Sequence, residues 1–89
     1  MQRTLTEIID LLETHQEQNW AKALRAILSV YQREGSSIAA GMVKGIYGGS
    51  GSFSDLVLHD KGNPVRQAND RLETLRRSLF DEALSTGTP

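Results

Sequence analysis

Residues 65–84 read VRQANDRLETLRRSLFDEAL, and this stretch predicts the most regular element of the chain. Its apolar residues recur three and four positions apart, at Val65, Ala68, Leu72, Leu75 and Leu79, with Phe80 and Ala83 widening the stripe. This spacing places them on one face of an α-helix. The preceding Asp60-Lys61-Gly62-Asn63-Pro64 is typical of a turn, and it predicts Asn63 as the N-cap and Pro64 as the first helical residue.

Two more amphipathic helices are predicted upstream. Thr4 and Glu7 have the spacing of a capping box, and the first helix is expected to end near His15. Its apolar stripe is formed by Leu5, Ile8, Ile9 and Leu12, and that of the second helix by Trp20, Leu24, Ile27, Leu28 and Tyr31. Gly35 is expected to close the second helix as a left-handed residue, with Ser36 and Ser37 placed to cap the next one.

Residues 38–47 predict a third, weaker helix. Ala39, Met42, Val43 and Ile46 share a helical stripe. Gly41 and Gly45 each cost about 1 kcal/mol relative to alanine inside a helix. Close packing of another backbone into the groove between these glycines could offset that cost.

Residues 53–58 are too short for periodicity to separate a strand from a helical turn. We favour a helical turn, because a lone strand would find no pairing partner in this chain. The resulting prediction is an all-α fold, an antiparallel bundle of three principal helices with a short glycine-bearing helix and its Gly-rich loop packed across one end. Residues 1–84 are expected to form a single domain and residues 85–89 a polar tail.

Composition excludes several classes of protein. A chain of 89 residues supports one core, and 10 Lys and Arg against 11 Asp and Glu leave a net charge of −1, without the basic footprint of a nucleic-acid module. The sequence has no cysteine, so disulfides and thiolate zinc sites are excluded. No apolar run is long enough to span a membrane and no secretory signal opens the chain, which together predict a cytoplasmic protein.

The densest feature is the Gly-rich stretch that follows the third predicted helix. Its candidate residues are Tyr47, Gly48, Gly49, Ser50, Gly51, Ser52, Phe53, Ser54 and Asp55. Consecutive glycine amides ahead of a helix start can bind an anion, but no lysine follows them as a P-loop requires. The structural alternative is a tight turn in which Ser52 caps a short helix and Asp55 returns to the Ser52 amide.

Residues 47–58 also resemble a family of small uncharacterised bacterial proteins with the signature Tyr-Gly-Gly-x-Gly-Ser-(Phe or Leu)-x-Asp-Leu-x-Leu. Trp20-Ala21 matches a second element of that family. The family often has Met and Asn where this chain has Ser50 and Ser54, so a partner contacted there would differ. The resemblance implies a standalone bacterial domain and brings no established activity.

Catalytic or metal-binding residues are not assigned. Asp55 and His59 lie four positions apart, but a zinc site needs a third ligand and His15 is expected in a distant connector. Ser54, Asp55 and His59 are the residue types of a hydrolase triad, without the nucleophile elbow that such a triad uses. The chain is therefore expected not to be an enzyme, and neither a cofactor nor a metal is predicted.

The charged residues are interpreted as solvated faces. Four arginines alternate with acidic residues along the last helix, at Arg66, Asp70, Arg71, Glu73, Arg76, Arg77, Asp81 and Glu82. Among these, Glu73 and Arg77 form a favourable i,i+4 pair. An acidic succession on the first helix, formed by Glu7, Asp10, Glu13 and Glu17, lies beside its apolar stripe. Recognition of a basic partner by this edge is the alternative to a solvated face.

The favoured function is a small bacterial protein-interaction module, in its most concrete form an immunity-type protein that neutralises a toxin. The partner is expected to be another protein whose identity the sequence does not give. Two alternatives stay open: an anion or nucleotide sensor using the Gly48–Ser52 loop, and a DNA-binding antitoxin. Whether the leucine stripe of the last helix packs within the chain or across the two-fold axis of a homodimer also stays open.

Overall fold

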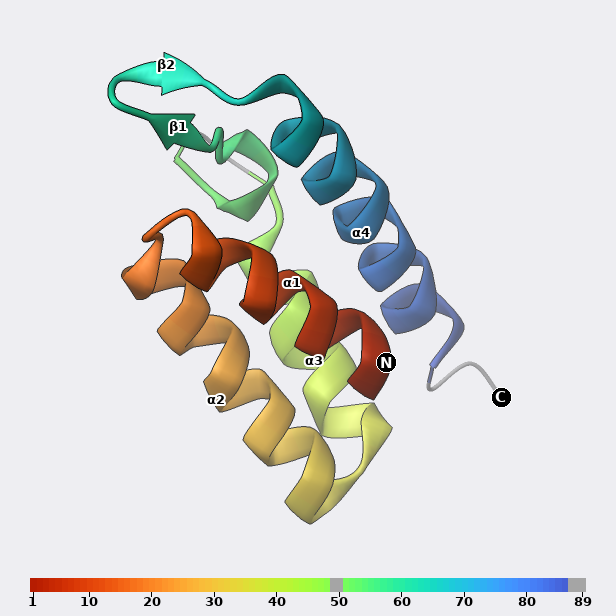
Figure 1. Cartoon of the computed structure of the whole chain (residues 1–89). Helices are drawn as coiled ribbons and strands as arrows, with labels where there is room; N and C mark the ends of the chain where they lie inside the picture. The colour runs from red at the N-terminus through yellow and green to blue at the C-terminus, as the bar shows by residue number, and fades with distance from the viewer. Residues whose placement is uncertain (49–50, 87–89) are drawn as a thin grey trace.

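The computed structural model describes residues 1–48 and 51–86, which are mostly helical (Figure 1). Within them the elements follow in the order α1 (Gln2–Thr14), α2 (Gln18–Glu34), α3 (Ser36–Ile46), the 3-10 helix η1 (Phe53–Asp55), β1 (His59–Asp60), β2 (Asn63–Pro64) and α4 (Arg66–Ser85). The all-α prediction is confirmed in outline, with a two-stranded hairpin added. None of the described helices is long and apolar enough to cross a membrane.

The helices surround one apolar core. Helix α1 packs against α2 and α4, and α3 packs against the same two helices (Figure 1). Leu72, Leu75 and Leu79 of α4 are buried in the same cluster as Leu24 and Ile27 of α2. The predicted apolar stripes of α2 and α4 therefore meet in a common core.

Helix α3 forms a side of this arrangement, where a piece packed across one end was expected. Its Ala39, Ala40 and Val43 are buried in the core, so the helix packs along its length. Gly41 and Gly45 are exposed, and a β-carbon added to either would meet no atom within 4 Å. The groove between these glycines is therefore not filled by another backbone in the described part of the chain.

The predicted capping box is wrong. Helix α1 begins at Gln2, two residues earlier than Thr4, and no side chain caps its start. The Thr4 hydroxyl instead donates to a Glu82 carboxylate oxygen at 2.8 Å, and Glu7 accepts from Arg71 at 3.2 Å. Both side chains thus contact residues of α4, and these tertiary contacts take the place of the predicted capping contacts. The predicted end of this helix near His15 is confirmed.

The junction between α2 and α3 is confirmed in part. Gly35 ends α2 with φ +91°, a conformation that glycine adopts without the steric cost of a β-carbon. Helix α3 then begins directly at Ser36 with Gly35 as its N-cap residue, and no side chain caps it. The prediction that Ser36 and Ser37 cap this helix is wrong, because both residues are already inside it.

The predicted start of α4 is also wrong, because Asn63 and Pro64 belong to the hairpin. His59 pairs with Pro64 and Asp60 with Asn63, and the two-residue turn between the strands has positive φ at Lys61 (+53°) and Gly62 (+83°). Such turns match the twist of antiparallel strands. Helix α4 begins at Arg66 and ends at Ser85, so the expected tail starts later, and residues 87–89 lie outside the described residues.

Candidate functional site

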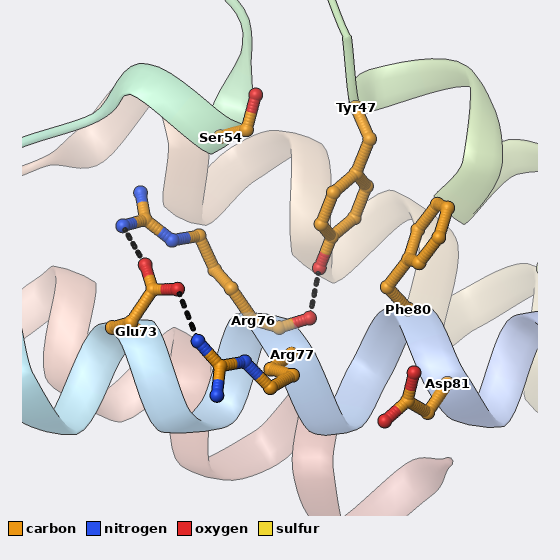
Figure 2. A pocket seen from close by; sticks show the side chains of 7 residues that line it. All are labelled: Tyr47, Ser54, Glu73, Arg76, Arg77, Phe80 and Asp81. Carbon is orange, nitrogen blue, oxygen red and sulfur yellow. Dashed lines mark hydrogen bonds and ion pairs between the residues drawn. The ribbon is translucent and has the colours of Figure 1, made fainter.

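A hollow of about 220 Å³ lies where the Gly-rich loop meets the outer side of α4 (Figure 2). Tyr47 comes from the end of α3, Ser54 from η1, and the remaining side chains from successive turns of α4. The full lining is Tyr47, Ser54, Glu73, Arg76, Arg77, Phe80 and Asp81. The site therefore combines two of the predicted loop residues with one face of the last helix.

Arg76 fixes the loop against α4. Its side chain is 11% exposed, and one guanidinium nitrogen donates to the backbone carbonyls of Phe53 and Leu56, each at 2.8 Å. The other nitrogen donates to Glu73 at 2.9 Å. A buried arginine is tolerated when its donors are satisfied in this way. Arg76 thus holds η1 and Leu56, which lies 20 positions earlier in the chain, against α4.

The sequence interpretation missed this residue, since it grouped Arg76 with solvated charges. A signal was present, because Arg76 lies four positions after Leu72 and three before Leu79, which places it on the buried stripe.

Aromatic rings form the apolar part of the site. Phe53 is fully buried, with the Trp20 ring at 5.2 Å and the Tyr47 ring edge-on at 5.7 Å between centroids. The Tyr47 ring also lies 4.9 Å from that of Phe80, and the Arg76 guanidinium lies over the Phe53 ring at 5.9 Å. These geometries are those of stabilising aromatic and cation–π pairs. The structural role predicted for Trp20 is confirmed by this packing.

The Tyr47 hydroxyl is engaged in the fold. It donates to the backbone carbonyl of Arg76 at 2.6 Å, an unusual partner because that carbonyl lies inside α4 (Figure 2). Burial raises the pKa of the Tyr47 phenol well above its ordinary value, only partly offset by the nearby Arg76 charge. Tyr47 therefore stays protonated and ties the end of α3 to α4.

Glu73 is shared between two arginines (Figure 2). One carboxylate oxygen accepts from Arg76 at 2.9 Å and the other from Arg77 at 3.3 Å, which confirms the predicted Glu73–Arg77 pair. The hydrogen bond from Arg76 is the main cause that lowers the pKa of the Glu73 carboxyl, and the charges of both arginines add to it. The Arg77 side chain is 75% exposed, so this charge remains accessible to a partner.

The described residues of the Gly-rich loop make contacts that differ from the predicted ones. Gly48 and Gly51 have φ of +94° and +77°. The Asp55 carboxylate accepts from the Gly51 amide at 3.0 Å, so the prediction that it returns to the Ser52 amide is wrong by one residue. Ser52 precedes η1, and its hydroxyl lies 2.7 Å from that of Ser54 without capping the helix. Gly49 and Ser50 lie outside the described residues.

This geometry bears on the anion-binding alternative. In the described part of the loop, the Gly51 N–H already donates to the Asp55 carboxylate, so an anion would have to displace that carboxylate to bind this amide.

Asn69 holds the segment that leaves the loop. Its side-chain oxygen accepts from the Leu58 amide at 2.7 Å, and its side-chain nitrogen donates to the carbonyls of Leu58 at 3.0 Å and Val65 at 2.9 Å. The Val65 amide also donates to the Leu58 carbonyl, at 3.1 Å. The first turn of α4 thereby fixes the position of Leu58, which follows the loop.

The other candidate residues are distributed between two further hollows. Asp55 and His59 line one of about 410 Å³ beside Trp20, which does not include Ser54. His59 also lines a polar hollow of about 110 Å³ together with His15, so the prediction that His15 is distant is wrong. Among the described residues, no three His, Asp or Glu side chains are grouped so that they could hold a metal ion.

A protein-family model described as a domain of unknown function, DUF6966, matches residues 13–66. The chain belongs to the DUF6966 family. The matched range contains α2, α3, the Gly-rich loop and the hairpin, and it ends at the first residue of α4. Tyr47 and Ser54 of the hollow thus lie inside the DUF6966 match, whereas its α4 residues lie beyond it. No curated protein and no solved structure matches the chain.

Proposed function

We propose that this DUF6966 protein is a protein-interaction module and that its partner site is the hollow of Figure 2. The aromatic floor of this hollow, set inside an exposed polar rim, carries the proposal. The volume of the hollow is about 220 Å³. Pockets for small molecules usually measure about 300–1,000 Å³. A space of this size fits one side chain of a partner protein, as interface hot spots do.

The chemistry of the lining supports recognition. Tyr47 and Phe80 provide an aromatic floor, and exposed Ser54, Arg77 and Asp81 form the rim. An apolar centre with a polar, accessible rim is typical of protein interfaces. The polar groups nearest the floor, on Tyr47 and Arg76, are already engaged in contacts that hold the fold. The hollow is therefore rigid at its base and adaptable at its edge.

In its more specific form, the proposal is that the module works in a bacterial cytoplasm and neutralises a toxin. This version is an analogy drawn from small size, balanced charge and a cysteine-free sequence. A toxin gene adjacent to the gene for this protein would support it. A toxin that stays fully active in the presence of the purified protein would contradict it.

Affinity purification with matched serine variants tests the general proposal. Ser54→Arg places a large side chain at the rim of the hollow, and Ser29→Arg makes the same change on the exposed part of α2. Tagged wild type and Ser29→Arg should recover the same dominant partner from cells of the source organism, and Ser54→Arg should lose it. Circular dichroism should show equal thermal stability for the three proteins. Recovery of the same proteins by all three variants, or of a small molecule in place of a protein, would refute the proposal.

A further inference from the structure

An apolar strip bordered by opposite charges runs along the outer side of α4. Phe80 is half-buried against Tyr47, and Leu84, one turn further along α4, is 50% exposed. Arg77 and Asp81 lie beside these residues, four positions apart and thus neighbours on the helix surface. The strip therefore presents a positive charge, an apolar centre and a negative charge in that order.

Both charges can take a new partner. Arg77 shares Glu73 with Arg76, and its contact at 3.3 Å is longer than that of Arg76 at 2.9 Å. If Arg77 turned away, Glu73 would still be neutralised by Arg76, which the two loop carbonyls hold in place. Within residues 1–48 and 51–86, the side chain of Asp81 forms no hydrogen bond or ion pair. The strip thus carries one weakly held cation and one unpaired anion.

The order of these two charges determines which kind of helix can bind to the strip. A helix lying antiparallel on α4 must present a basic residue opposite Asp81 and then, further along its own sequence, an acidic residue opposite Arg77. Helix α4 itself has this order, since Arg77 precedes Asp81. In a two-fold pair the same patch faces itself, so each of these contacts forms twice. A parallel pair would instead set Arg77 against Arg77.

We propose that a second copy of this chain covers the hollow, with the two α4 helices antiparallel, Arg77 of each copy facing Asp81 of the other, and the Phe80 rings near the two-fold axis. Phe80 and Leu84 then lose their contact with water on both copies. With Arg77 facing Asp81, only residues 73–85 of α4 face the partner helix, about 20 Å, so the pair buries less than the roughly 1,200 Å² of a standard interface. The pair is accordingly weak and forms at high protein concentration.

Self-association goes beyond the proposed function, and it affects binding of the partner protein. The partner protein and the second copy use the same hollow, so they compete for it. A rise in the concentration of this protein therefore lowers its apparent affinity for the partner.

Sedimentation equilibrium between about 10 µM and 1 mM tests the pair. Wild type should shift from monomer to dimer across this range, and added salt should weaken the dimer. Arg77→Glu and Asp81→Arg each set like charges against each other, and each should raise the dissociation constant by about tenfold or more. An equimolar mixture of the two single variants restores both opposite-charge contacts and should form a heterodimer. The double variant should dimerise with itself.

Arg66→Glu and Asp70→Arg are the matched controls, because Arg66 and Asp70 have the same charges and spacing on α4 outside the hollow. Both should dimerise like the wild type. A wild type that stays monomeric at 1 mM, single variants that dimerise as well as the wild type, or a mixture that stays monomeric would overturn the pair. Dissociation by the control substitutions would overturn the proposed axis near Phe80. Recovery of the partner protein, measured at low concentration, does not depend on these results, so each proposal can fail separately.

Discussion

Replacement of Arg76 by methionine tests how the loop is held to α4. Methionine keeps much of the length and apolar volume of the arginine stem, so the substitution removes chiefly the hydrogen bonds. The Phe53 carbonyl lies in a buried contact and keeps only the Leu56 amide, at 3.3 Å, as a donor, while the Leu56 carbonyl is partly accessible to water. A hydrogen bond from a charged donor contributes about 1.5–3 kcal/mol. With the smaller contribution of Leu56, we expect a loss of about 2–4 kcal/mol in the free energy of unfolding.

The neighbouring Arg77 provides the control. Its side chain is 75% exposed and makes one ion pair at 3.3 Å, a contact that is worth about 0–1 kcal/mol at a surface. Arg77→Met should therefore unfold almost like the wild type, although it changes the net charge by the same amount. Arg76→Lys should fall between the two, because an ammonium group cannot reproduce the forked contacts of the guanidinium.

Urea unfolding followed by circular dichroism and by Trp20 fluorescence measures these differences. Trp20 packs on Phe53, so its emission reports on the loop directly. For a domain of this size, about 2–4 kcal/mol corresponds to a fall of roughly 10–25 °C in Tm. If Arg76→Met and Arg77→Met differ by less than about 0.5 kcal/mol, the contacts to the loop carbonyls do not stabilise the fold and the argument for Arg76 fails.

Three further predictions concern the surroundings of the site. Gly51→Ala should destabilise the protein by about 1 kcal/mol or more, because φ at Gly51 is +77°. Gly41→Ala on the exposed side of α3 should instead stabilise it by about 0.5–1 kcal/mol. Thermal melts of both variants check the signs of these changes. Asn69→Ala should cost about 1–3 kcal/mol and speed amide exchange at Leu58, while equal exchange in both proteins would show that the side-chain bridge is dispensable. The raised pKa of Tyr47 means that its contribution to stability is complete below about pH 10 and falls as pH rises above the unfolded value, because the unfolded chain ionises first. Above pH 10, the unfolding free energy of the wild type should therefore decline more steeply than that of Tyr47→Phe. The difference between the two slopes should be less than about 1.4 kcal/mol per pH unit, because the ring is partly solvated. Equal slopes would contradict a protonated Tyr47 in the folded state.

The amino-acid sequence by itself determined the helices and their buried faces. The stripe of Leu72, Leu75 and Leu79 and that of Leu5, Ile8 and Leu12 are buried as their spacing indicates. Gly35 ends α2 where a positive φ was expected. These features are local, because a periodicity of three and four residues and a glycine terminus are properties of neighbouring positions in the chain.

Tertiary structure decided the starts of the helices and the hairpin. Thr4 had the pattern of a cap, but the carboxylate of Glu82, 78 positions away, offered its hydroxyl a partner. Asn63 and Pro64 had the pattern of a helix start, but the reversal at Lys61 and Gly62 paired them with β1. In both cases a contact distant in sequence, or a pairing across a turn, was stronger than a cap that contributes about 1 kcal/mol.

The candidate site also needed the tertiary structure. The sequence pointed to the loop residues Tyr47, Phe53 and Asp55. The carbonyls that Arg76 binds, however, face this arginine only because of the way the backbone of η1 turns. A backbone carbonyl has no sequence signature, so the choice between a solvated and a buried arginine on α4 could not be made from side-chain types alone. The sequence determined which apolar helix faces could pack together. The backbone groups that folding brings close decided which polar side chains are buried between the helices.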